Sequence, residues 1–272
     1  MDTVEGVNRL QDDLDNFSKW ARDWQMQFNV DKCKVLHLGK SNPRNKYVMD
    51  GKELEGIEVE KDLGVMVHQS LKPSVQVAAA AKKANQVLGQ ILRAFTYRDK
   101  EHDIKLYTSR VRCHLEYAVQ TWNPWLAKDI EVLESVQKRA VRQVRGLTGS
   151  YEEKLKQCGL TLLKDRRLRG DLIQTFKIIN QVDNIPIDTF FKIAGESHGH
   201  ATRNVVTVIP GEESESKTVT KMNLVKPKAN TDIRKNFFSH RTVDHWNNLP
   251  DNVKMAKDVN NFRNLYDAFT RN

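Results

Sequence analysis

Two adjacent carboxylates near the N-terminus, Asp12 and Asp13, are the first residues with recognisable chemistry. Nucleotidyl transfer uses carboxylates that hold two metal ions about 4 Å apart. A pair with that role sits on a tight turn between apolar strand residues. Here the pair lies between Leu10 and Leu14 in a run with helical periodicity, on the side away from both leucines. The pattern therefore predicts exposed helix residues and no metal site.

Three other motifs carry weaker signals. His198–His200 (His-Gly-His) is a metal half-site without a second ligand pair at matching spacing, so a loop position is favoured. Cys113 and His114 combine a thiol with a base, but adjacent helix residues point in different directions, which favours packing. Trp122 and Trp246 are candidates for stacking on bases, but core packing is favoured for both.

The strongest signal is the basic stretch 138–177. It holds eleven Lys or Arg residues against four Asp or Glu, an excess of seven within a net charge of +9. Arg139, Arg142 and Arg145 are three apart, so a helix would place them on one side, opposite its apolar stripe. Spaced guanidinium groups can follow a phosphate backbone without reading sequence. The alternative is an ordinary solvated face, and the shortage of pairing acids favours nucleic-acid contact.

Composition bounds the class of protein. The 272 residues are 39% hydrophobic and 8% aromatic, which predicts a folded chain with a sizeable core. The three cysteines form no CxxC pair, so a disulfide framework is not expected. We therefore expect the protein to reside in a reducing compartment. Neither a signal peptide nor a membrane-spanning stretch is visible. We therefore expect an intracellular protein, in the cytoplasm or the nucleus, with no membrane partner.

The elements that must position these residues divide the chain in two. Residues 7–28 have helical periodicity, and 33–39, 47–49 and 63–67 read as strands. Asp50-Gly51 predicts a hairpin turn. From residue 72 onward the pattern is helical. The predicted fold class is α+β, with a small N-terminal helix and antiparallel strands followed by a mostly α-helical bundle.

Four units follow from these patterns. Residues 1–70 form the α+β unit, 71–194 the helical unit, 195–235 a flexible loop or hairpin, and 236–272 a C-terminal helical segment. Within the helical unit, the apolar repeats predict helices over 77–95, 103–117, 133–144 and 168–179.

Eight strings, in order along nearly the whole chain, resemble the reverse transcriptase region of LINE-type (non-LTR) retrotransposons of the vertebrate jockey-like type. They are Leu10–Leu14 with Trp20 and Trp24, Phe28–Lys34, Glu60–Val65, Ala81–Gly89, Val111–Ala118, Leu133–Ala140, Arg166–Ile173, and Phe237–Arg241 with Trp246–Pro250. A single string is weak, whereas eight in sequence are specific. Cys113 departs from the family pattern, which usually has proline there, so the bend before His114 is in doubt.

The resemblance implies the C-terminal part of such an enzyme, comprising the end of the palm, the thumb and the region after it. The family's endonuclease, fingers and metal-binding aspartate motifs would lie upstream, so the resemblance implies no catalytic residue and no activity of this chain alone. It implies no cofactor here, whereas the complete family enzyme would use Mg. The implied partners are RNA and the RNA–DNA template–primer duplex, and the oligomeric state stays open.

The resemblance also assigns residues. Lys32 or Lys34 would occupy the motif that assists pyrophosphate departure, Leu63 and Gly64 would lie in the primer grip, and the first thumb helix would follow residue 72. Together with the basic stretch, this gives a predicted set of nucleic-acid contacts. The set is Lys32, Lys34, Leu63, Gly64, Lys82, Lys83, Lys138, Arg139, Arg142, Arg145, Arg166, Arg167 and Arg169.

Three hypotheses remain at this point. The leading one is a reverse transcriptase fragment that binds template–primer but does not polymerise. The second is a helical module that holds a protein partner. The third is a translated relic without a selected role, in which residues 1–70 would be the weak point because half a palm exposes a sheet edge.

Overall fold

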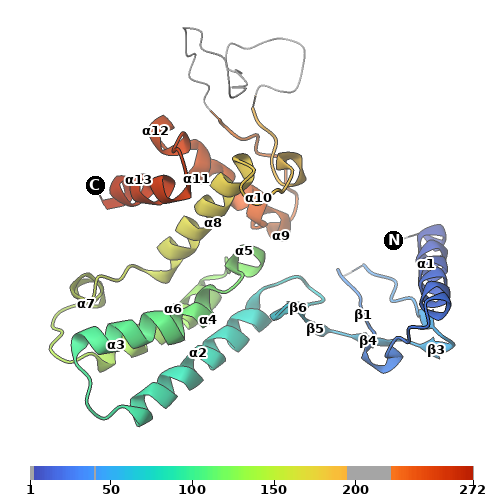
Figure 1. The fold of residues 1–272 in the computed structure, drawn as a ribbon, viewed down its shortest axis with the longest axis horizontal. Coiled ribbons are helices and arrows are strands. Elements are labelled where there is room, and N and C mark those ends of the chain that lie inside the picture. Colours follow the sequence, from blue (N-terminus) through green and yellow to red (C-terminus); the bar gives the residue numbers. More distant parts are fainter. Residues whose placement is uncertain (1–2, 40, 195–221, 272) are drawn as a thin grey trace, which may run out of the picture.

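The computed structural model describes residues 3–39, 41–194 and 222–271, and within them the chain is mixed α+β (Figure 1). The α-helices are α1 (Val4–Asp23), α2 (Ser74–Ala94), α3 (Lys100–Leu106), α4 (Arg112–Glu116), α5 (Val119–Trp122), α6 (Ala127–Gln143), α7 (Tyr151–Gln157), α8 (Leu163–Ile179), α9 (Asp232–Lys235), α10 (Phe238–Arg241), α11 (Val243–Asn247), α12 (Asp251–Lys254) and α13 (Val259–Arg271). The strands are β1 (Lys34–Leu36), β2 (Val48–Met49), β3 (Lys52–Glu53), β4 (Glu55–Ile57), β5 (Val59–Asp62) and β6 (Val65–His68). The predicted fold class is confirmed.

Helix α1 starts at a Thr3 cap, whose hydroxyl accepts a hydrogen bond from the Gly6 amide at 3.2 Å. Its first half packs Val7, Leu10 and Leu14 against a small core formed by Tyr47, Met49 and Leu54. The predicted apolar stripe continues further, but Phe17 and Trp24 are 49% and 68% exposed. In the second half of α1, Ser18 and Ala21 are buried, and the exposed apolar surface is that of the large aromatic side chains.

The strands form three separate pairs. The pairs β2–β3 and β5–β6 are antiparallel, as predicted. The pair β1–β4 is parallel, with Lys34 opposite Glu55, so the prediction of antiparallel strands is wrong here. The reason is the connection: the β2–β3 hairpin lies between β1 and β4, and this crossover returns the chain in its original direction.

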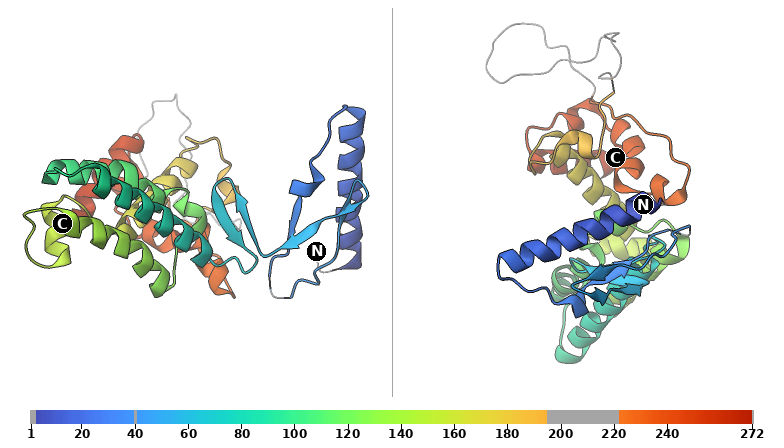
Figure 2. Two further views of the ribbon diagram at one scale, coloured as in Figure 1. Left: turned by 90° about the horizontal axis from the view of Figure 1, so that it is seen from below. Right: turned by 90° about the vertical axis from the view of Figure 1, so that its right-hand side faces the viewer.

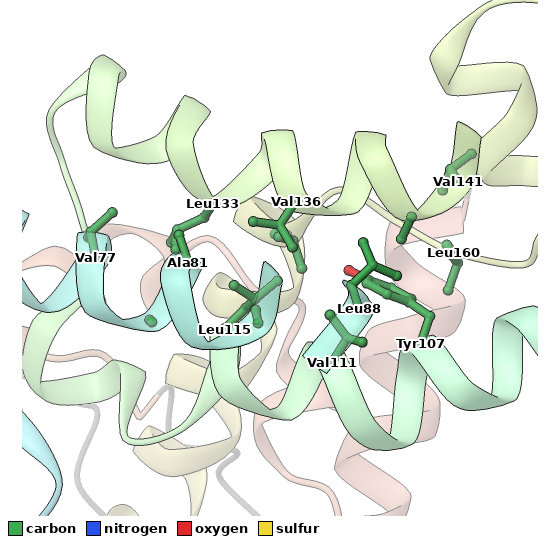
Figure 3. Packing of buried hydrophobic residues seen from close by; sticks show 14 of the residues in the cluster. Val77, Ala81, Leu88, Tyr107, Val111, Leu115, Leu133, Val136, Val141 and Leu160 are labelled. Atoms are coloured by element: carbon green, nitrogen blue, oxygen red, sulfur yellow. The ribbon is translucent and has the colours of Figure 1, made fainter. Parts of the chain in front are cut away.

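The first helical core lies between α2, α6 and the segment from α3 to α4. Figure 3 shows Val77, Ala81 and Leu88 of α2 facing residues of α6 such as Leu133 and Val136. Ala84, on the same face of α2, is fully buried, and this row of alanines lets the two helices approach closely. Each large apolar side chain buried here stabilises the fold by about 1.5–3 kcal/mol.

The segment predicted as one helix over 103–117 has three parts. Between α3 and α4, residues Tyr107–Val111 form a π-helical turn. The hydroxyls of Thr108 and Ser109 donate to carbonyls of the preceding turn, which is a common cause of local unwinding. The turn sends Tyr107 into the core, where its hydroxyl donates to Gln137 Oε1 at 2.8 Å.

A second helical core is built on the C-terminal half of α8. Phe176 and Trp246 both stack on Phe262 in this core, with centroid separations of 4.6 and 6.0 Å. The sequence predicted one helical unit over 71–194, whereas the packing divides inside α8, from Leu172 onward. The left view of Figure 2 shows α1 and the strands at one end of the molecule and the helical region at the other.

Part of the predicted loop 195–235 is ordered. Leu224 is buried and forms a bridge with Ile193, and α9 follows at 232–235. The remainder, 195–221, lies outside the described residues. No described helix is both long enough and apolar enough to cross a membrane.

Candidate nucleic-acid interface

Helix α2 carries an unusual distribution of charge. Its 21 residues include Lys82, Lys83 and Arg93 and no Asp or Glu. All three basic side chains are exposed, and none forms an ion pair with another described residue. Arg93 lies over Gly89, where an added Cβ would come within 3.5 Å of the guanidinium. Helix α2 is therefore basic from Lys82 to its C-terminal end.

Helix α6 runs beside α2 in the same direction. The Ser74 hydroxyl donates to Asp129 Oδ2 at 2.6 Å near the start of both helices. Three turns further on, Arg139 Nη1 donates to Asn85 Oδ1 at 3.1 Å. These bonds fix the register and bring the exposed edge of α6 next to the basic edge of α2.

We call the shared surface the α2–α6 face. It comprises Lys82, Asn85 and Arg93 of α2 and Lys128, Ser135, Arg139 and Arg142 of α6. At 1.5 Å per residue, the cations extend over about 16 Å on α2, from Lys82 to Arg93, and over about 21 Å on α6, from Lys128 to Arg142. Two small residues of α2, Ala78 and Gly89, have little side-chain bulk. A ligand backbone can therefore approach the helix closely at these positions.

The three carboxylates of α6 are either buried or paired with a lysine. Asp129 and Glu134 are 5% and 7% exposed. Glu134 accepts hydrogen bonds from Gln137 Nε2 and the Leu163 amide, both at 3.0 Å. Glu131 is paired with Lys138 at 2.7 Å. Within the described part of α2 and α6, no exposed carboxylate is left without an ion-pair partner.

The predicted contacts on α6 divide accordingly. Arg139 and Arg142 are exposed opposite the apolar stripe, as the three-residue spacing predicts. Arg145 is also exposed but lies beyond the end of α6 at Gln143, so it does not share their helical face. Lys138 points toward α7, where it lies over the Tyr151 ring at 5.6 Å.

The three arginines of α8 all make hydrogen bonds to other parts of the protein, and Arg167 is buried. Arg167 is 2% exposed and donates to Asn123 Oδ1 at 3.0 Å, and burial lowers its pKa. A guanidinium buried in that position does not reach a phosphate. We therefore do not retain Arg167 among the predicted nucleic-acid contacts. Arg166 makes two hydrogen bonds to the Glu116 carboxylate. Arg169 makes two to Asp267, at 2.6 and 2.8 Å.

These side chains are cross-links between helices. They belong to a polar junction that also joins Asp171 of α8 to Arg241 of α10 through two hydrogen bonds of 2.9 Å. Arg241 additionally donates to the Gln120 carbonyl at 3.0 Å. The basic density of α8 therefore holds the two helical cores together.

The N-terminal lysines are exposed. Lys34 pairs with Glu55 on the neighbouring strand β4, and the bond from Lys34 lowers the pKa of that carboxylate. Lys32 ends a short 3-10 turn (Val30–Lys32) and forms no ion pair with another described residue. The two lysines lie beside the strands and are not part of the α2–α6 face.

Leu63 and Gly64 form the tip of the β5–β6 hairpin. They are a two-residue loop between Asp62 and Val65, with φ of 44° and 88°. The sequence placed them at the start of a strand, and the structure corrects this to a turn. Leu63 is 86% exposed, so the tip presents an apolar side chain.

The remaining motifs behave as packing or surface residues. Asp12 and Asp13 are exposed on α1, as predicted. Trp122 and Trp246 are buried, and their indole N–H groups donate to the carbonyls of Tyr117 and Met222, which confirms core packing. Among the described residues, no group of three or more His, Cys, Asp or Glu is arranged to hold a metal ion. His198–His200 lies outside the described residues.

Sequence reasoning missed Arg93 and Lys128. Neither residue lies in a dense basic stretch: Arg93 stands among neutral residues, and Lys128 is followed directly by Asp129. The signal that identifies Arg93 is the absence of acids from residues 74–94, together with its position three helical turns after Lys82. No comparable signal in the sequence identifies Lys128. Their grouping with Arg139 and Arg142 depends on the packing of α2 against α6.

Comparison with known proteins identifies a similar sequence of known type. The chain is similar to a reverse transcriptase encoded by a retrotransposon. That relative is the RNA-directed DNA polymerase from mobile element jockey of Drosophila funebris, with 22% identity over 165 residues. The match covers 59% of this chain and 18% of the relative, so the chain spans less than a fifth of the protein it matches. No protein-family model matches the chain, and no solved structure matches it.

Proposed function

We propose that this chain is the nucleic-acid-binding C-terminal part of a LINE-type RNA-directed DNA polymerase, of the vertebrate jockey-like type. In this proposal residues 1–70 are the end of the palm, the helices after residue 72 form the thumb, and the ligand is RNA or an RNA–DNA template–primer duplex. The observation that carries the proposal is the α2–α6 face, which carries basic residues on two parallel helices and no exposed carboxylate without an ion-pair partner. The similarity to the jockey polymerase supports it.

The face suits a phosphate backbone for geometric reasons. Its cations are mounted on rigid helices, so they lose less freedom on binding than cations in loops. Arginine donates through a planar fork that matches phosphate oxygens, whereas lysine contributes a point charge. Nothing in this arrangement selects a base. The binding is therefore independent of nucleic-acid sequence.

The hairpin tip supplies the second contact. Leu63 and Gly64 occupy the position that the family resemblance assigns to the primer grip, and an exposed apolar residue on a rigid turn can rest against a sugar or base edge. Lys32 and Lys34 complete the proposed set on the palm side. Lys83 and Arg145 are exposed and stay in the proposed set outside the α2–α6 face.

We further propose that the chain alone does not extend primers. Its adjacent carboxylates, Asp12 and Asp13, lie on an exposed helix and not on a hairpin between strands. Primer extension with magnesium and dNTPs tests this directly. Robust extension by the purified chain would refute the proposed inactivity and leave the binding proposal standing.

Charge reversal tests the binding proposal. Arg139→Glu with Arg142→Glu should abolish measurable binding to an RNA–DNA duplex. The control is Arg9→Glu with Arg263→Glu, which changes the net charge equally at exposed positions on α1 and α13. Equal loss in both variants would mean that net charge alone attracts the duplex. Unchanged duplex binding, together with loss of a captured protein, would identify a protein-interaction module instead.

A further inference from the structure

The tip of the β5–β6 hairpin combines two costly features. Both loop residues have positive φ, as in the hairpin turns that favour Asn or Gly at the first position. Leu63 occupies that position with φ of 44°, a conformation unfavourable for a residue with a bulky side chain. The same leucine is 86% exposed. Folding alone would favour Asn here, so strain and exposure together point to a role in contact with a ligand.

The hairpin is held by the helices at two levels. At its stem, the Met66 amide donates to Gln76 Oε1 of α2 at 2.8 Å, and Gln76 is 6% exposed. Val65 is buried in the first helical core. The stem is therefore fixed to the thumb-like helices.

At the tip, the holding residue is Tyr117, which ends α4. Its hydroxyl donates to the Leu63 carbonyl at 3.0 Å. Its ring packs against Gly64, where an added Cβ would lie 3.3 Å from Tyr117 Cε1, and the φ of 88° favours glycine at this position. Tyr117 thus contacts both residues of the loop.

Tyr117 is itself firmly placed. The next residue, Ala118, has φ of 51°, and this left-handed residue turns the chain sharply after α4. The Tyr117 carbonyl accepts a hydrogen bond from the buried Trp122 indole at 2.8 Å. The tyrosine nevertheless keeps 57% of its surface exposed, so it contributes little to a core.

We propose that Tyr117 is a positioning residue that holds the hairpin tip so that Leu63 contacts bound nucleic acid. This inference rests on the proposed function. It assigns Tyr117 to the binding apparatus through the tip, and it links the tip to α4 and the helical core. The contact made by Leu63 is apolar, so it adds affinity without displacing counterions from phosphates.

Hydrogen exchange of the free chain tests the positioning step without a ligand. Tyr117→Phe keeps the ring and removes one hydrogen bond, so the amides of residues 59–68 should exchange about fivefold faster. Tyr97→Phe, at an 85% exposed tyrosine in the loop after α2, is the control and should change nothing. Unchanged exchange in Tyr117→Phe would overturn the inference.

A double-mutant cycle on duplex affinity tests the contact. Leu63→Asn suits the turn but removes the apolar side chain, and should weaken binding about tenfold. Tyr117→Ala removes both contacts with the loop and should weaken binding by a similar factor. The double variant should bind no more weakly than Tyr117→Ala, because the tip is already displaced. All three should keep the wild-type salt dependence.

The outcomes separate the inference from the function on which it rests. Additive losses, about a hundredfold in the double variant, would show that Tyr117 acts independently of the tip and would overturn the inference. Unchanged affinity in Leu63→Asn, with binding lost in the Arg139 and Arg142 charge reversal, would also overturn it while the proposed function stands. A wild-type chain that does not bind the duplex would overturn both.

Discussion

The polar junction between the two helical cores gives a sharp stability prediction for Arg241→Met. Arg241 makes two hydrogen bonds of 2.9 Å to Asp171, which is 1% exposed, and also donates to the carbonyls of Gln120 and Asn236 at 3.0 Å. Methionine fills much of the space and removes every donor. The Asp171 carboxylate then stays buried with Asn123 as its nearest donor, at 3.2 Å.

The expected loss at neutral pH is about 3–5 kcal/mol, the usual effect of removing one partner from a buried ion pair. This is a large share of the about 5–15 kcal/mol by which domains are stable. The double variant Asp171→Asn with Arg241→Met should lose less than the single one, because no charge is left buried. Urea unfolding followed by tryptophan fluorescence measures both, since Trp246 lies in the second core.

The stability that Arg241→Met loses relative to the wild type should depend on pH in a defined direction. Burial raises the pKa of Asp171, while hydrogen bonds and positive charge from Arg241 lower it, so the pKa rises further in Arg241→Met. A carboxyl group with a raised folded-state pKa stabilises the fold when protonated and loses that contribution as pH rises through the folded value. The deficit of the variant should therefore shrink from about pH 7 to about pH 5. A loss below about 1 kcal/mol at neutral pH, or a deficit independent of pH, would refute the reasoning.

Two further predictions concern local stability. Ser150→Ala removes a capping box in which the Ser150 hydroxyl and the Glu153 side chain each accept an amide hydrogen bond. The variant should be less stable by about 1 kcal/mol in urea unfolding. An unchanged stability would contradict the role of the cap. Phe262→Ala removes a fully buried ring stacked on Phe176 and Trp246, and should cost about 3–5 kcal/mol, whereas the control Phe269→Ala, at a ring 46% exposed, should cost little. Equal losses at the two phenylalanines would contradict the described core.

The sequence predicted helices best where apolar residues repeat over several turns. Residues 77–95 and 133–144 correspond to α2 and α6, because a buried stripe requires that spacing. The strand pairs were less predictable. The parallel pairing of β1 with β4 depends on the path between them, and alternation of apolar residues does not encode direction.

The excess of basic residues could be predicted from the sequence, but not which of them are exposed and which are paired with carboxylates. Arg166 and Arg169 add to the basic stretch, yet their carboxylate partners Glu116 and Asp267 lie 50 and 98 residues away in sequence. Local counting cannot find such partners. It also overlooked Lys128 and Arg93, which join the α2–α6 face only through the packing of two helices.

The hairpin tip shows a third limit. Leu-Gly-Val reads as a strand from residue types, because leucine is rare in turns with positive φ. The structure places Leu63 there because the register pairs Asp62 with Val65 and leaves a two-residue loop.

The central claim is that the α2–α6 face binds the phosphate backbone, and the salt dependence of duplex binding tests it most directly. Five cations of the face are available: Lys82, Arg93, Lys128, Arg139 and Arg142. Each phosphate contact adds about 0.7–0.9 to the slope of log K against log salt, so the full chain should bind an RNA–DNA duplex with a slope of about −3.5 to −4.5. A slope near zero, or no binding at low salt, would contradict the account.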